Sequence, residues 1–348
     1  MASQARVLQA GGGSASHGQD DTVEIDPNFG GEDDDFDSAM DVNPSSTASL
    51  SSSILAYRKM YGRTYANFTT GTENWTPNDE TQNNSLDMLH HMVYLAYGNR
   101  LFQAPIGNSP SRVLDIGTGT GIWAIDFADE FPVCEVIGTD LSPIQPSWVP
   151  PNCKFELDDA QQDWTWPDSH FDYIHVRALM GSIDDWPRFC KQAMRYLKPG
   201  GYLEIFDFSA NMQSDDGVFG PDHVYTQWFE LFQQAGDKIG KTFEIIDHGR
   251  AAGWMRDAGF AHVTEVKKKL PMGGWPKDPR LKEIGIFHMA SASAALEGYL
   301  LYTMTNVLGW TYEDVQVFAA KCRATLRDRS IHAYVNSAAV YGQKPSAA

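Results

Sequence analysis

The stretch that decides the fold is VLDIGTGTGIWAIDFADEFP, residues 113–132. A short apolar run holds Asp115 near its end, and an amphipathic segment follows. Between them stand three glycines at alternate positions: Gly117, Gly119 and Gly121. Glycines here let the backbone turn sharply and approach a ligand closely. The stretch therefore predicts a buried strand, a ligand-binding turn and a helix.

The alternation of strand and helix continues toward the C-terminus. Residues 121–131 and 186–201 have the pattern of helices. Seven segments have the pattern of strands: residues 112–116, 134–140, 153–159, 171–177, 202–208, 262–270 and 331–345. This order predicts an α/β fold with a doubly wound, Rossmann-like, mainly parallel sheet of seven strands.

Three further regions complete the expected organisation. Residues 1–50 are rich in Gly, Ser and Asp and are expected to form an acidic disordered tail. Residues 51–107 are expected to form an N-terminal helical cap. Within this cap, we expect Tyr57, Tyr61 and Tyr65 to share one face of a helix. We expect Asn78 or Asp79 to cap a second helix, which has an apolar stripe. The α/β domain spans residues 108–345, with a helical insertion at about 270–330 before the last strand.

Composition narrows the possible partners. The net charge is −18, and residues 1–50, with ten acidic residues and one Arg, account for half of it. A nucleic-acid backbone would be repelled. We find no run of eighteen apolar residues and no signal-peptide pattern, so we expect neither membrane insertion nor secretion. The four cysteines lie far apart, which predicts no metal site and a cytoplasmic or nuclear location.

Acidic residues at the ends of the next two strands indicate the ligand. Asp140 ends the second strand, where a carboxylate can accept hydrogen bonds from both ribose hydroxyls. Asp158 or Asp159 follows the third and could accept from an adenine amino group. A dinucleotide fingerprint needs a glycine at position 122, where Ile122 stands. The site therefore suits an adenosine ligand without a pyrophosphate.

Several motifs carry a resemblance to a known family: VLDIGTGTG, GTDLSP, DDAQQDW, FDYIHVR and YLKPGGYLEIFDF. Together they resemble the class I S-adenosylmethionine-dependent methyltransferases. The segments GRTY, PNDE, LHH, WPKDPRLKEIG, DRSIHAY and YGQKP extend the likeness over about residues 50–345. They resemble the fungal Lae-type methyltransferases, which are also labelled as similar to trans-aconitate methyltransferase domains and include velvet-linked regulators of secondary metabolism.

The resemblance implies S-adenosylmethionine as cofactor and assigns residues to it. Asp140 and Leu141 would contact the ribose and adenine, and Asp159 and Ala160 the adenine. Arg177 would face the methionine or the acceptor. The residues implied to wrap the methionine half and ribose are Asp115, Gly117, Thr118, Gly119 and Gly121.

From the residues themselves, a tyrosine stripe could roof the site and contact the sulfonium through its rings. The residues in question are Tyr57, Tyr61, Tyr65 and Trp75, of which Tyr65 is our candidate for a cofactor contact.

The methyl acceptor is left open by the sequence. The (N/D)PP(Y/F) signature of amino-group methyltransferases is absent, and HVRALMGSIDDW stands in its place. Candidates for a catalytic role are His90, His91, Arg177 and His332.

Two functions follow. The first is an enzyme that methylates a small molecule or a protein, with a weak preference for an oxygen acceptor. The second is a regulatory protein that keeps the fold and acts by binding partners in a velvet-like complex.

Overall fold

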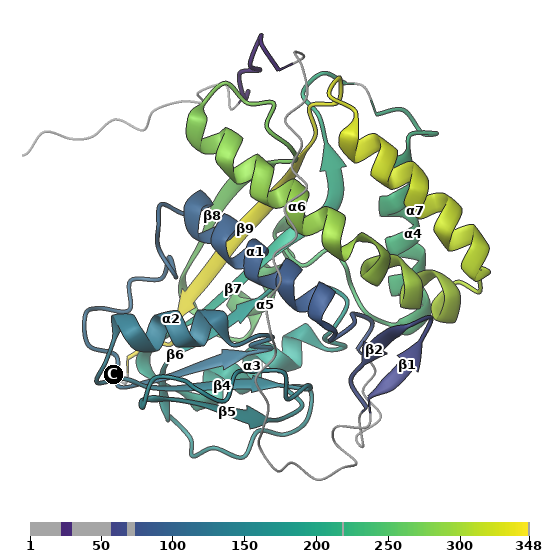
Figure 1. The fold of residues 1–348 in the computed structure, drawn as a ribbon. Helices are drawn as coiled ribbons and strands as arrows, with labels where there is room; N and C mark the ends of the chain where they lie inside the picture. Colours follow the sequence, from purple (N-terminus) through teal and green to yellow (C-terminus); the bar gives the residue numbers. More distant parts are fainter. Residues whose placement is uncertain (1–21, 30–56, 68–73, 218, 347–348) are drawn as a thin grey trace, which may run out of the picture.

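The computed structural model describes residues 22–29, 57–67, 74–217 and 219–346 (Figure 1). Its centre is a seven-stranded sheet of order β5-β4-β3-β6-β7-β9-β8. The first five of these strands pair in parallel, and β9 is antiparallel to both β7 and β8. This confirms the predicted fold. The strand bounds are β3 (Arg112–Ile116), β4 (Glu135–Asp140), β5 (Cys153–Leu157), β6 (Phe171–Arg177), β7 (Leu197–Gln213), β8 (Ala261–Pro271) and β9 (Tyr334–Gln343).

Helices cover both faces of the sheet because successive side chains of each central strand point to opposite faces. Val113 of β3 packs in a cluster with α2 (Ile122–Glu130). Its neighbour Leu114 packs in a second cluster with α3 (Trp186–Tyr196) and α5 (Arg250–Asp257). The short 3-10 turn η1 (Asp247–Gly249) leads into α5. The parallel strands are therefore buried on both sides, as a doubly wound fold requires.

A third apolar cluster lies beside the extended part of β7 and β9 (Figure 1). It is built by α1 (Glu80–Ala96), α4 (Val224–Ile239), α6 (Pro279–Tyr302) and α7 (Tyr312–Arg327). Helix α6 and the π turn η2 (Thr303–Val307) are long and apolar enough to cross a bilayer by composition, but half of this segment is buried in the protein. Helix α6 is therefore a core helix, and it lies with α7 between β8 and the last strand, β9.

The first tyrosine-rich segment differs from the predicted helix. It forms a hairpin of β1 (Arg58–Met60) and β2 (Arg63–Tyr65), with Tyr61 and Gly62 in the turn at positive φ. Positive φ at both turn residues matches the right-handed twist of a two-residue hairpin, and a helix cannot include it. The shared-face prediction was wrong because a spacing of four residues does not by itself exclude a strand.

The other predictions for the N-terminal region have mixed outcomes. Asp79 caps α1 by accepting a hydrogen bond from the backbone N–H of Gln82, as predicted. Most of residues 1–50 lie outside the described residues. Residues 22–29, however, are placed on the protein body: Ile25 pairs with Pro276, and the carboxylate of Asp26 pairs with Lys282. Local composition missed this contact because its partners lie about 250 positions away in the sequence.

Candidate active site

The turn after β3 has the conformation that its glycines predict. Gly117, Gly119 and Gly121 have φ values of +68°, +58° and +82°, a region that favours glycine. A Cβ atom on Gly117 would lie 2.6 Å from the side chain of Leu179, and one on Gly121 would overlap the Phe155 ring. Backbone conformation and close packing therefore both require glycine at these two positions.

The side chain of Asp115 stabilises this turn. Its Oδ2 accepts a hydrogen bond from the Thr118 hydroxyl at 2.6 Å, and its Oδ1 lies 2.7 Å from Nδ1 of His175. Asp115 is only 3% exposed and lines neither of the cavities described below. Both of its oxygens therefore support the turn from within the protein, and its contact with the methionine or ribose stays a prediction.

His175 is a residue that the sequence reasoning missed. It lies on β6 with its ring stacked on Trp123 of α2 at a centroid distance of 3.7 Å. Burial lowers the pKa of His175, although the hydrogen bond to Asp115 acts in the opposite direction. A strand histidine gives no local signal of such a partner, because register with β3 is what sets it opposite Asp115.

Asp140 stands at the centre of the site. Its Oδ2 accepts a hydrogen bond from the backbone N–H of Gly119 at 2.8 Å, and its Oδ1 accepts one from Ser142 at 2.9 Å. Each carboxylate oxygen keeps a further lone pair for a ligand. Burial raises the pKa of Asp140 to about 6, against the opposing effect of the backbone hydrogen bonds. The side chain lines both cavities of the site.

The smaller cavity has a volume of about 60 Å³ and lies beyond the ends of β4 and β5. Asp159 is buried there and accepts hydrogen bonds from the backbone N–H of Gln161 and the side chain of Gln162. The lining combines apolar surfaces with acidic acceptors, as an adenine ring requires. It includes the predicted Leu141, Asp159 and Ala160, together with Asp158, Gln161 and Ile183.

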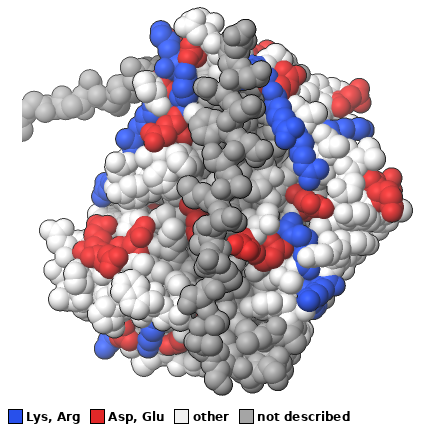
Figure 2. Space-filling model, viewed as in Figure 1, with Lys and Arg blue, Asp and Glu red and all other residues white. Residues whose placement is uncertain are grey.

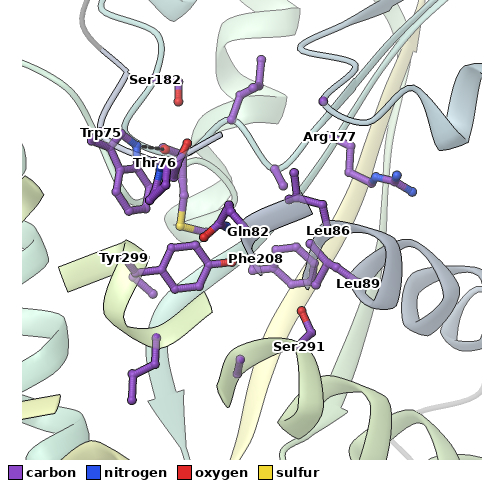
Figure 3. A pocket seen from close by; sticks show the side chains of 18 of the residues that line it. Trp75, Thr76, Gln82, Leu86, Leu89, Arg177, Ser182, Phe208, Ser291 and Tyr299 are labelled. Carbon is purple, nitrogen blue, oxygen red and sulfur yellow. Dashed lines mark hydrogen bonds between the residues drawn. The ribbon is translucent and has the colours of Figure 1, made fainter. Parts of the chain in front are cut away.

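The larger cavity, of about 250 Å³, begins at Gly117, Thr118 and Gly119 and reaches α6 and α7 (Figure 3). Among the described residues that line it, the charged ones are Asp140 and Arg177, both at the end near the glycine turn. The far end is lined mainly by apolar and aromatic side chains: Phe208, Met212, Tyr225, Trp228, Phe232, Met272, Leu296, Leu326 and Val335.

Arg177 ends β6 and lies at the edge of this cavity in Figure 3. No described residue forms a hydrogen bond or ion pair with its guanidinium. Burial lowers the pKa of Arg177, and the nearby carboxylates of Asp115, Asp126 and Asp87 act in the opposite direction. Arg177 therefore has hydrogen-bond donors free for an anionic group.

Four predicted candidates do not line either cavity. His90 is buried with Nε2 2.9 Å from Asp126, while His91 is exposed and its ring meets Phe287 edge to face. His332 lies 2.7 Å from Asp216, with its ring near Trp275. Tyr65 is buried, with its ring 6.1 Å from that of Tyr302. Tertiary packing gives each of these side chains a neighbour outside the cavities, and their roles stay predictions.

The remaining residues of the tyrosine stripe lie in different surroundings. Trp75 lines the larger cavity and donates from Nε1 to the carbonyl of Met180 at 3.1 Å. Tyr57 lies close enough to Asp140 that this carboxylate adds to burial in raising the pKa of the tyrosine. Tyr61 is half exposed and stacks on Tyr312. Of the four, Trp75 is therefore the one that lines a cavity.

Three polar residues of the larger cavity were missed: Gln82 from α1 and His288 and Tyr299 from α6. Figure 3 shows Gln82 and Tyr299 together beside Phe208. Nδ1 of His288 lies 2.9 Å from the carbonyl of Pro271. No local motif marks these positions, because they meet only when α1 and α6 pack side by side.

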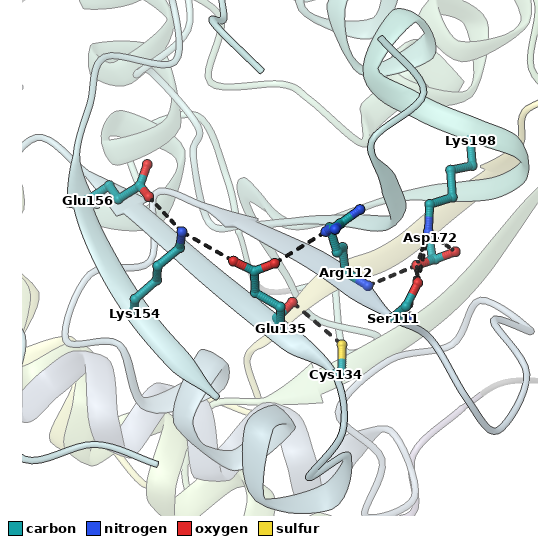
Figure 4. Close-up of polar contacts among 8 residues, drawn as sticks. All are labelled: Ser111, Arg112, Cys134, Glu135, Lys154, Glu156, Asp172 and Lys198. Carbon is teal, nitrogen blue, oxygen red and sulfur yellow. Dashed lines mark hydrogen bonds and ion pairs between the residues drawn. The ribbon is translucent and has the colours of Figure 1, made fainter. Parts of the chain in front are cut away.

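The described residues also form charged clusters away from these two cavities. Figure 4 shows one at the opposite end of the strands, where Glu135 pairs with Arg112 and Lys154, and Asp172 pairs with Lys198. Most of these side chains are substantially exposed, so the pairs stabilise the fold weakly. Within the described residues, no group of three or more His, Cys, Asp or Glu side chains could hold a metal ion.

Residues 88–265 match the methyltransferase domain family. The chain belongs to the S-adenosylmethionine-dependent methyltransferases of the Lae type. This methyltransferase is 40% identical to the methyltransferase pytC of Aspergillus terreus over 303 residues, 86% of this chain and 92% of pytC. It is 33% identical to the secondary metabolism regulator LAE1 of Cochliobolus heterostrophus, over 79% of this chain and 91% of LAE1.

Among solved structures, the methyltransferase is similar to phosphoethanolamine N-methyltransferase 2 of Haemonchus contortus in complex with S-adenosyl-L-methionine. The sequence identity is 18%, with a TM-score of 0.41, over 76% of this chain and 53% of that protein.

The two cavities fit S-adenosylmethionine. The lining of the small cavity offers acceptors for adenine, and the near end of the large cavity lies beside the glycine turn. Asp140 lines both cavities, which is where a ribose that joins adenine to methionine has to lie. The cofactor supplies an activated methyl group, so the protein's task is to align an acceptor and exclude water.

Proposed function

We propose that this methyltransferase, which is linked to secondary metabolism, methylates a small apolar molecule that binds in the larger cavity. The observation that carries the proposal is the distribution of charge along the cavity. The charged residues that line it in the described part of the chain lie near the glycine turn, and the far end is apolar and aromatic. Such a lining favours a neutral, largely apolar ligand over a charged one, because burying an unpaired charge is costly.

In this proposal, the residues of the chain divide the work. Asp140, Asp159 and Arg177 hold the ribose, the adenine and the carboxylate of the cofactor. The aromatic and aliphatic walls bring the acceptor to the methyl group and keep water out. Alignment of this kind supplies a large part of the rate enhancement when the donor is already activated.

A cavity-filling variant tests the proposal. Ala292 lines the cavity from α6, while Ser293, the next residue, is exposed. We expect Ala292→Trp to abolish methylation of small apolar acceptors with little change in S-adenosylmethionine affinity, because the new ring occupies the acceptor's space. Ser293→Trp is the matched control and should retain both.

The readouts are titration calorimetry with S-adenosylmethionine and transfer of labelled methyl to fractionated metabolites. Undiminished transfer by the Ala292→Trp protein would contradict the proposal.

One observation favours a second function, a regulatory protein that binds protein partners. The chain is 33% identical to LAE1, which is named a secondary metabolism regulator. The face shown in Figure 2 intersperses acidic and basic side chains, which suits a protein partner better than nucleic acid. Under this alternative the protein acts in the cytoplasm or nucleus within a velvet-like complex.

Complementation by Asp140→Ala separates the two functions. Full activity in cells without cofactor binding would favour the scaffold, and loss of activity with partners still bound would favour the enzyme.

A further inference from the structure

The part of the large cavity's wall that α6 supplies contains a histidine with a fixed tautomer. The carbonyl of Pro271 can only accept a hydrogen bond, so Nδ1 of His288, 2.9 Å away, carries the hydrogen. In the neutral ring Nε2 is then a bare acceptor, and no described residue forms a hydrogen bond with it. His288 is only 6% exposed and lines the cavity. Burial lowers the pKa of His288 to about 4, which keeps the ring neutral.

Close backbone packing holds this arrangement in place. Gly285, one turn before His288 on α6, accepts a hydrogen bond at its carbonyl from the backbone N–H of Gly273 at 2.9 Å. A Cβ atom on Gly285 would overlap the carbonyl of Gly273, so only glycine allows this approach. The segment that carries the Pro271 carbonyl is therefore fixed against α6, and the direction of the imidazole is fixed with it.

The neighbouring groups are neutral. The ring centroid of Phe208 lies 6.4 Å from that of His288, and the hydroxyl of Ser291, one turn further along α6, is engaged with Ser85. Cys322 also lines the cavity, and burial raises the pKa of its thiol to about 12, so that it stays protonated. Within the described lining of the cavity, Nε2 of His288 is therefore a basic nitrogen without a hydrogen-bond partner in the protein.

We propose that Nε2 of His288 binds the hydroxyl group of the methyl acceptor and accepts its proton, so that the acceptor is a neutral apolar molecule bearing an O–H group. This inference rests on the proposed function. The acceptor oxygen forms the new bond to the methyl carbon while the carbon–sulfur bond breaks and its electron pair stays on sulfur. The hydroxyl proton moves to Nε2 and leaves to water when the product departs.

The charge balance of this step suits an apolar site. The sulfonium loses its positive charge as the imidazolium of His288 gains one, so the net charge of the cavity does not change. A neutral acceptor also avoids burying a separate anion among aromatic side chains, which would be costly. His288 thus acts as a general base, and it takes up the proton while the sulfonium loses its positive charge by giving up the methyl group.

The test uses the full chain and the variant His288→Asn, whose amide can still donate to the Pro271 carbonyl but lacks the basic nitrogen. The matched control is His248→Asn, since His248 is a largely exposed histidine distant in sequence. We expect unchanged S-adenosylmethionine affinity in both variants. For His288→Asn we expect kcat for hydroxyl acceptors to fall on the order of a hundredfold.

A binding measurement tests the contact without turnover. The probes are 2-naphthol and naphthalene, added to protein labelled with ¹⁵N-histidine. We expect 2-naphthol to bind about tenfold more tightly than naphthalene and to shift the Nε2 resonance that His288→Asn removes. The preference should vanish in that variant.

Equal affinity for both probes, or no binding of either, would overturn the assignment of His288. Failure to bind S-adenosylmethionine would instead overturn the proposed function.

Discussion

Replacement of Asp140 by Asn should weaken cofactor binding strongly while leaving the fold intact. Both oxygens of Asp140 already accept a backbone N–H, from Gly119 and from Ser142. The NH2 group of the Asn side chain would face one of these backbone N–H groups, so that two donors meet without an acceptor. The Asn side chain also carries no charge. Hydrogen bonds to a charged group contribute about 1.5–3 kcal/mol each.

Losing one to two such bonds to the ribose should cost about 2–4 kcal/mol, since one of the two acceptor oxygens is lost outright. Tenfold in affinity corresponds to about 1.4 kcal/mol, so Kd should rise roughly 30- to 1000-fold. Titration calorimetry with S-adenosylmethionine and S-adenosylhomocysteine measures this directly. Asp129→Asn is the control, because Asp129 is exposed on α2 and lines neither cavity.

The pH dependence of binding gives an independent check. Burial raises the pKa of Asp140 to about 6, and ribose hydroxyls donate to the ionised carboxylate. At a pH below this pKa, cofactor binding therefore has to displace the proton of Asp140. The affinity for S-adenosylmethionine should fall about tenfold between pH 7.5 and pH 5. The Asn variant should lack this dependence. A folded Asp140→Asn protein whose Kd stays within threefold of the natural one would refute the role assigned to Asp140.

Three further variants test the rest of the site. Gly121→Ala should lower the free energy of unfolding by about 2 kcal/mol or more, measured in urea, because the new methyl overlaps the Phe155 ring at a positive φ. Arg177→Met should weaken S-adenosylmethionine binding about tenfold but leave adenosine binding unchanged, since adenosine has no carboxylate; equal losses for both ligands would count against the assignment. Asp115→Asn should destabilise the fold by about 1–3 kcal/mol through the weakened bond to Thr118, and an unchanged urea midpoint would be inconsistent with that support.

Much of the candidate cofactor site could be predicted from sequence because its residues stand at the carboxyl ends of successive strands. Gly117 directly follows β3, Asp140 ends β4 and Asp159 lies two residues after β5. The carboxyl ends of parallel strands meet at one edge of the sheet. Asp115 shows the limit of this reasoning. Its position was predicted correctly, but its partner His175 comes from another strand and leaves its oxygens engaged within the protein.

The acceptor side could not be predicted in the same way. The histidines proposed from sequence, His90, His91 and His332, lie outside the cavities, and His288, which lines one, was not singled out. A histidine's surroundings depend on which helices pack against it and not on its neighbours in the chain. Tyr57 and Tyr61 illustrate the same point locally, since their spacing fits a helix face but the positive φ of the turn makes a hairpin.

By itself the sequence determined the doubly wound sheet, the glycine turn and the acidic residues that line the cavities at the strand ends. These features depend on local periodicity, on the special backbone of glycine and on the order of strands and helices. Only the tertiary structure decided which side chains line the large cavity beyond the glycine turn. Helix α1 precedes α4, α6 and α7 by more than a hundred residues, and the apolar chamber with His288 at its wall exists only where these helices pack together.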